Sequence, residues 1–138
     1  MNSWGPGCWD NEAALDLVSD LLDSSNANAL LDEALAAASP DADLLASARA
    51  VAAADLAAAT RGRPGVDLPE DARELIGLFM VFASDETLER ALGAVRTARA
   101  NGTALHAHWH ASVDGEQWTH RMGLLEARLA ELAGAGRG

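Results

Sequence analysis

Hydrophobic residues recur along most of this chain with the spacing of an α-helix, and short polar stretches separate the periodic segments. The first segment spans residues 11–23 and places its apolar residues on one side of a helix. We expect Asp10 to cap the N-terminus of this helix, because its carboxylate can accept a hydrogen bond from a free backbone N–H group. The predicted inner face consists of Ala14, Leu15, Val18, Leu21 and Leu22.

The same periodicity predicts six further helices and therefore an all-α protein. The run from Leu75 to Phe82 is hydrophobic enough to be a strand, but residues 69–74 have helical character and no partner strand is apparent, so a helix is favoured. We expect one compact domain over residues 1–133 and a frayed glycine-rich tail at 134–138. The further helices are expected at about 28–38, at 40–60 with Ser39-Pro40 as the start signal, from Pro69 through Phe82, from Ser84 to a stop at Asn101-Gly102, at 103–111 and at 116–132.

The segment at 40–60 carries an apolar residue, most often alanine, on nearly every face. Such a helix usually lies at the centre of a fold with neighbours on several sides. Asp55 stands in the middle of this run. Because a buried carboxylate needs a charged or hydrogen-bonding partner, we expect one of the ten arginines to pair with it.

A turn rich in glycine and tryptophan precedes the first helix. Glycine permits positive φ and proline fixes φ, so residues 5–7 predict a tight turn. We expect the two indoles of this region to be buried against the helices as an aromatic plug, with Cys8 as a small buried filler rather than a reactive thiol. The residues assigned to the plug are Trp4, Gly5, Gly7, Trp9, Asp10 and Asn11.

The same segment, Trp4-Gly5-x-Gly7-x-Trp9-x-Asn11, resembles the start of the bacterial family called domain of unknown function 4259. Members of that family typically begin with W-G-x-G, an aromatic residue and an acidic or Asn-rich helix start. Leu105, Trp109 and Trp118 are similar to the closing pattern of the family, so the resemblance spans nearly the whole chain. The chain departs from the pattern at Asn2-Ser3 and in its His-rich segment. The resemblance implies no activity and no catalytic residues.

Charge and composition narrow the classes of partner. The formal net charge is -11, and residues 1–60 carry ten Asp and Glu against one Arg, which accounts for -9 of it. This balance argues against nucleic-acid binding and fits a basic protein partner. The single cysteine excludes an internal disulfide and is typical of the cytoplasm. Neither a signal peptide nor a membrane span is expected, and the abundance of alanine without lysine is typical of a GC-rich bacterial genome.

His106, His110 and Asp114 are the residues best spaced to bind a metal ion. On a helix they fall at i, i+4 and i+8, where two imidazoles and a carboxylate could hold zinc or nickel, while His108 points elsewhere. On a strand the three histidines would instead share one face. No HExxH motif and no second ligand cluster supports a metal site, so a solvated polar face without a cofactor is the favoured interpretation.

Four acidic residues form a stripe opposite the inner face of the first helix. Like charges one turn apart destabilise a helix by roughly 0.2–0.5 kcal/mol per pair. Such a stripe is either a solvated face or a surface for a basic partner, and a divalent-ion site is the third interpretation. The stripe consists of Glu12, Asp16, Asp20 and Asp23.

These observations favour a non-catalytic protein-interaction module over an enzyme. There is no GxSxG motif, no P-loop and no GxGxxG fingerprint in the chain. A small acidic protein of this kind could mask a basic partner as an immunity protein or an antitoxin does. The alternative is a metal-binding protein or metal-dependent enzyme that uses His106, His110 and Asp114. The sequence leaves the oligomeric state open.

Overall fold

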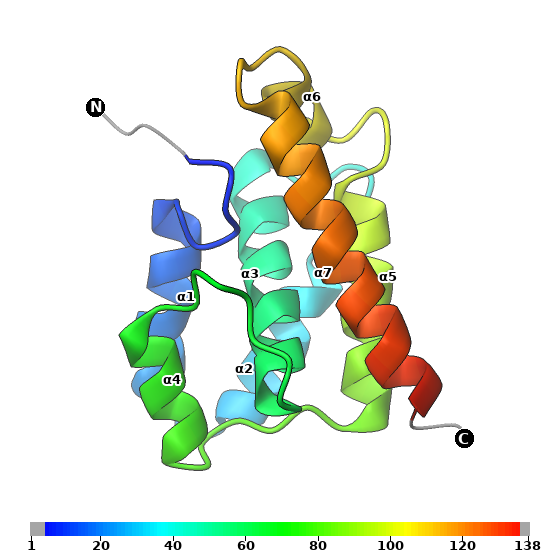
Figure 1. The fold of residues 1–138 in the computed structure, drawn as a ribbon. Helices are drawn as coiled ribbons and strands as arrows, with labels where there is room; N and C mark the ends of the chain where they lie inside the picture. The colour runs from blue at the N-terminus through cyan, green and yellow to red at the C-terminus, as the bar shows by residue number, and fades with distance from the viewer. Residues whose placement is uncertain (1–4, 136–138) are drawn as a thin grey trace.

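The computed structural model describes residues 5–135, and within them the chain forms seven helices and no strand. The all-α class and the single compact domain are confirmed (Figure 1). No helix in the described part of the chain is both long enough and apolar enough to cross a membrane. The helices are α1 (Glu12–Leu22), α2 (Ala27–Ala36), α3 (Leu44–Thr60), α4 (Glu70–Gly77), α5 (Asp85–Ala98), α6 (Ala104–His110) and α7 (Gly115–Ala135).

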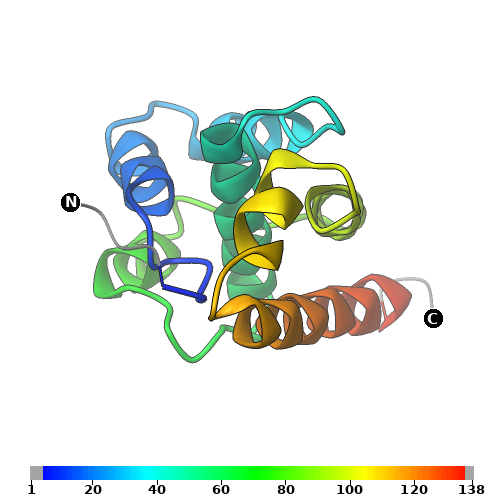
Figure 2. The ribbon, with the colours of Figure 1, turned by 90° about the horizontal axis from the view of Figure 1, so that it is seen from above.

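Helix α3 is the central element, as its apolar composition predicts. It contacts each of the other six helices, which surround it when the molecule is seen from above (Figure 2). Every residue from 50 to 59 is buried. Most of them are alanines, whose short side chains allow the neighbouring helices to approach on several sides and fill the interior closely.

The predicted register of α1 is wrong at one position, and its cap is shifted. Leu15 is 54% exposed, whereas Leu17 is fully buried in its place. The N-cap is Asn11, whose side chain accepts a hydrogen bond from the Ala14 N–H at 2.9 Å, rather than Asp10. Two overlapping apolar stripes share residues 14, 18 and 21, and packing against the central helix selects the stripe that includes position 17.

Two other helix boundaries differ from the predictions. Helix α3 begins at Leu44 rather than at Pro40, because the Asp43 side chain caps it by accepting from the Ala46 N–H at 2.8 Å. Helix α7 continues to Ala135, so the first two residues of the expected tail at 134–138 are helical. Residues 136–138 and Trp4 lie outside the described residues.

The largest correction concerns the hydrophobic run after Pro69, which is helical only as far as Gly77. The Met80 N–H donates to the Leu75 carbonyl and the Phe79 N–H to the Ile76 carbonyl, both at 3.0 Å. This pair of bonds is the Schellman motif, which ends a helix with one residue in the left-handed region. Residues beyond the motif are extended or irregular, so the prediction of a helix through residue 82 is wrong.

The same motif ends α3, where a glycine, the usual residue, occupies the left-handed position. The Arg63 N–H donates to the Ala58 carbonyl and the Gly62 N–H to the Ala59 carbonyl, with Gly62 at φ 86°. In α4 the equivalent position is Phe79, at φ 58°, the only non-glycine residue with positive φ in residues 5–135. A side chain with a Cβ is strained in this region, typically by about 1–2 kcal/mol.

We predict that Phe79→Gly stabilises the protein. The Phe79 side chain is 92% exposed, so its removal loses little burial, while glycine relieves the left-handed strain. The expected gain in the free energy of unfolding is roughly 1 kcal/mol, measured by urea denaturation. Gly62→Phe, the reverse change at the matched position of α3, should destabilise by a similar amount. A loss of stability in Phe79→Gly would show that the aromatic ring contributes packing that outweighs the strain.

Candidate functional site

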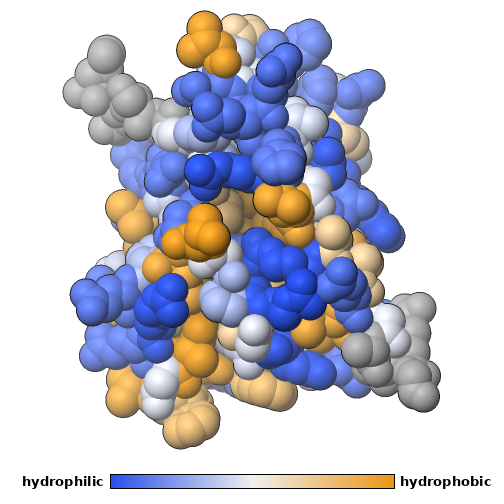
Figure 3. All heavy atoms as spheres, viewed as in Figure 1, coloured by the Kyte–Doolittle hydropathy of each residue, from blue (hydrophilic) through white to orange (hydrophobic). Residues whose placement is uncertain are grey.

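One cleft of the molecule has a volume of about 430 Å³ and a largely apolar lining. It lies between the N-terminal segment, the loop at 61–69 and helices α6 and α7. Its apolar wall includes Trp109 and Trp118, whose rings stack with centroids 6.2 Å apart. On the face drawn in Figure 3, several apolar patches alternate with hydrophilic side chains. Arg63, Asp67, Arg121, Arg128 and Glu131 are the charged lining residues.

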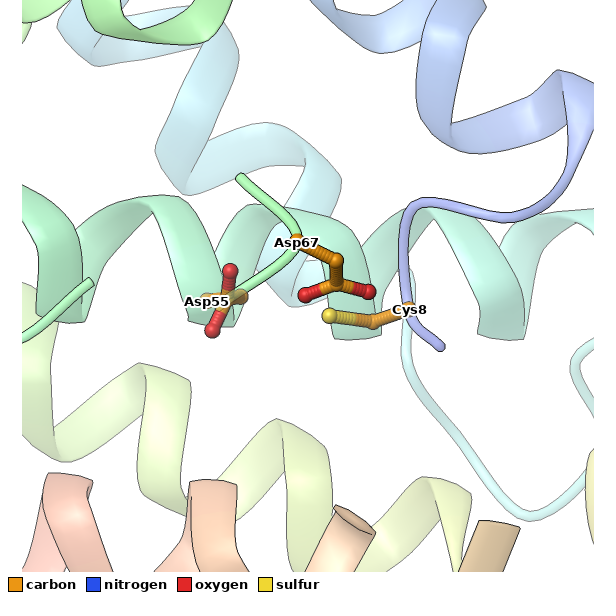
Figure 4. A group of neighbouring side chains, drawn as sticks. All are labelled: Cys8, Asp55 and Asp67. Carbon is orange, nitrogen blue, oxygen red and sulfur yellow. The ribbon is translucent and has the colours of Figure 1, made fainter. Parts of the chain in front are cut away.

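Three titratable side chains meet beside the cleft: Cys8 from the N-terminal segment, Asp55 from α3 and Asp67 from the loop before α4. Figure 4 shows them directed toward one another. One sulfur or oxygen atom from each lies within 4.8 Å of the other two. In residues 5–135 this is the one group of three or more His, Cys, Asp or Glu side chains whose ligand atoms are this close.

Asp55 is fully buried and is held by two strong donors. The Trp9 Nε1–H donates to Oδ2, and Arg128 Nη2 donates to Oδ1, each at 2.7 Å. Arg128 also donates to the backbone carbonyl of Arg63 at 2.7 Å. The expected arginine partner of Asp55 is therefore Arg128, and Trp9, itself 4% exposed, is a second partner that the sequence did not indicate.

Asp67 is in a less favourable environment. Its Oδ2 atom is buried and accepts no hydrogen bond, and the nearest cation is Arg121, with Nη1 at 3.7 Å. Burial raises the pKa of the Asp67 carboxyl, and the negative charges of Asp55 and Asp10 raise it further, while Arg121 lowers it. Because Oδ2 accepts no hydrogen bond, the protonated form of the Asp67 carboxyl is favoured.

The thiol of Cys8 is unsuited to nucleophilic chemistry. Burial raises its pKa well above the ordinary value of 9.0, and the charges of Asp55 and Asp67 raise it further, with Arg128 acting in the opposite direction. Because the thiolate is the nucleophilic form, this environment keeps Cys8 inert. Cys8 is half-buried and packs against the core, so the expectation of a buried filler is met only in part.

Gly7 is required by space rather than by backbone conformation. The expected tight turn forms, with the Asp10 N–H donating to the Gly7 carbonyl at 3.1 Å, but Gly7 does not have the positive φ that glycine permits. A Cβ atom at position 7 would collide with Asp67 Oδ2 and lie 2.8 Å from Asp10 Oδ2. The Gly7 N–H also donates to Asp10 Oδ2 at 3.0 Å. The turn is therefore packed against Asp67, with no room for a larger side chain at position 7.

The sulfur and two carboxylates are donors that zinc accepts, but their surroundings oppose a cation. Both Asp55 oxygens already accept hydrogen bonds, and the guanidinium groups of Arg121 and Arg128 lie beside the cluster. Asp55, with its bonds to Trp9 and Arg128, therefore works as a buried hydrogen-bonded centre. It ties the N-terminal segment to α3 and α7.

A family model described as Domain of unknown function (DUF4259) matches residues 2–121. The chain belongs to the DUF4259 family. No curated protein and no solved structure matches it. Membership assigns no activity, so any function of this DUF4259 protein has to be argued from its own surfaces.

The predicted histidine site is not assembled as the helical spacing implied. Helix α6 ends at His110, so Asp114 lies in the turn before α7 rather than at i+8 of one helix. The His106 and His110 rings stack with centroids 5.4 Å apart, and both border a second hollow that His120 also lines. Zinc or nickel binding by His106, His110 and Asp114 stays a prediction.

The acidic stripe of this DUF4259 protein lies in full on the outer face of α1. Glu12, Asp16, Asp20 and Asp23 are all exposed. Asp20 forms an ion pair with Arg49 at 2.9 Å. Asp16 and Asp23 have no ion pair within residues 5–135.

We predict that Asp67→Asn makes the protein more stable at neutral pH. A raised folded pKa means that the carboxyl of Asp67 favours folding when protonated, so wild-type stability falls as pH rises from about 3.8 through the folded pKa. Asparagine removes this fall, and the difference from wild type should vanish at pH 3. Urea denaturation at pH 3, 5 and 7 measures it, with the exposed Asp41→Asn as the control. A difference that does not change with pH would contradict this origin.

Proposed function

We propose that this DUF4259 protein is a non-catalytic interaction module that binds a basic protein through the outer face of α1. The observation that supports it is the exposed stripe of Glu12, Asp16, Asp20 and Asp23, in which Asp20 pairs with Arg49 while Asp16 and Asp23 have no ion pair within residues 5–135. A surface of one charge sign attracts a partner of the opposite sign and accelerates its association.

The stripe opposes the stability of its own helix. Asp16 and Asp20 repel each other at i, i+4, and Asp20 and Asp23 at i, i+3. The last two also lie toward the C-terminal end of α1, which is the negative end of the helix dipole, and no basic residue occupies its last turn. Arg49 offsets part of this repulsion at Asp20. A basic partner would remove the remainder.

A neighbouring helix also carries exposed acidic residues. Helix α4 contacts α1, and the two lie side by side in both views of the fold (Figures 1 and 2). Glu70, Asp71 and Glu74 are exposed on α4, against one arginine, Arg73. The exposed acids of α4 thus add to the negative charge near the stripe on α1.

The chemistry beside the cleft supports a binding role rather than catalysis, because Cys8 is held as the neutral thiol. In this proposal the protein is a bacterial cytoplasmic partner of a basic protein. It would mask the basic surface of that protein as an immunity protein or an antitoxin does.

We predict that Asp16→Asn/Asp23→Asn weakens partner binding while it slightly stabilises the isolated protein. The double variant removes all three like-charge pairs of the stripe (12/16, 16/20 and 20/23) and leaves the Asp20–Arg49 pair intact, so the free energy of unfolding should rise by a few tenths of a kcal/mol. Captured partners from a lysate of the native organism are identified with each bait. The association rate with the captured protein is then measured against salt concentration, and it should be slower and less salt-dependent for the double variant.

The matched control is Glu33→Gln/Asp41→Asn, which makes the same change in net charge at two exposed acids outside α1. It should behave as wild type. Equal capture and equal association rates for all three proteins would refute a role for the stripe.

A further inference from the structure

A second unusual surface follows α4 directly. Leu78, Phe79 and Phe82 are exposed by 59%, 92% and 60%. Large apolar side chains that are exposed as neighbours are typical of binding surfaces, whereas single ones are common on any protein. Phe79 additionally occupies the left-handed position that glycine holds at the matched end of α3. The fold therefore displays an aromatic ring to solvent at the expense of backbone strain.

The backbone at the end of this segment is held by side chains of α2 and α3. The Phe82 N–H donates to Asn28 Oδ1 at 2.8 Å, and the Ala83 N–H donates to Thr60 Oγ1 at 3.0 Å. Val81 is buried, and the Arg61 guanidinium lies 5.5 Å from the centroid of the Phe82 ring. A partner that covers this surface therefore meets side chains on a fixed backbone, which lowers the entropy lost on binding.

The charges next to this surface indicate the chemistry of its partner. The apolar residues follow a helix whose exposed side carries Glu70, Asp71 and Glu74 against one arginine, Arg73. Arg61, beside the Phe82 ring, is itself paired with Asp85 at 3.1 Å. Leu78 lies one helical turn after Glu74, and two turns after Asp71, on the same side. An apolar surface bordered by carboxylates is complementary to an apolar surface bordered by lysine or arginine.

We propose that residues 78–82 and the exposed side of α4 bind an amphipathic helix of the partner protein, with basic residues flanking its apolar stripe. This inference rests on the proposed function and names the segment of the basic partner that is recognised. A helix fits better than an added strand, because residues 5–135 contain no sheet edge to extend. The carboxylates of α4 would repel both an anionic lipid surface and the same surface of a second copy.

Two synthetic helical peptides test the inference. One has a leucine stripe flanked by lysines, and its twin carries glutamine at every leucine position, so the two have equal charge. The wild-type protein should bind the leucine peptide at least about tenfold more tightly than the glutamine peptide by fluorescence anisotropy. Phe79→Gly should reduce the affinity for the leucine peptide to nearly that for its twin, although this variant is expected to be the more stable protein.

The control variant is Val113→Ser, which removes an apolar side chain that is 99% exposed outside this surface. It should bind both peptides as wild type does. Equal wild-type affinity for the two peptides, or an unchanged affinity in Phe79→Gly, overturns the inference and leaves the proposed function standing. Failure of both peptides to bind overturns the inference. It also contradicts the proposal that the protein binds a basic partner.

Two further measurements separate other occupants of the surface. Sedimentation of the wild type and of Phe79→Gly should show the same oligomeric state, and neither protein should bind phosphatidylserine vesicles. Self-association or vesicle binding that Phe79→Gly abolishes would assign the surface to a second copy or to a membrane and overturn the inference.

Discussion

The buried carboxylate of Asp55 is the interaction on which the rest of the structure depends. An unpaired charge in the alanine-rich interior of α3 would be strongly unfavourable. Trp9 and Arg128 satisfy it from opposite ends of the chain, and Arg128 also binds the carbonyl of Arg63. A single side chain thus fixes the N-terminal segment, α7 and the loop before α4 against the central helix.

The groups around Asp55 have a structural role, whereas the features proposed for binding lie on the exterior. Around Asp55 the thiol of Cys8 is protonated and the carboxyl of Asp67 favours its proton, so these groups serve the fold. Two exterior features instead oppose the stability of the isolated chain: the like charges of α1 and the strained, exposed Phe79. A partner that is basic and apolar would offset both, which is why function is assigned to this side of the molecule.

The helical class and the central position of α3 were predictable, because a helix with alanine on all its faces buries them only when other helices surround it. The need of Asp55 for an arginine was also predictable, but the choice of Arg128 was not, since it depends on how α7 crosses α3. Asp67 and Arg121 gave no signal because their importance arises only where three segments meet. The end of α4 was missed because Phe79 occupies the position where a helix stop is normally marked by glycine.

Hydrogen exchange of the Trp9 indole N–H, followed by NMR under native conditions, tests the central claim most directly. If the bond to Asp55 fixes the N-terminal segment, this proton should exchange only through global unfolding. Its exchange free energy would then equal that of the slowest backbone amides of α3. Exchange at a clearly lower free energy, with the α3 amides still protected, would show that the segment opens independently and would contradict the account.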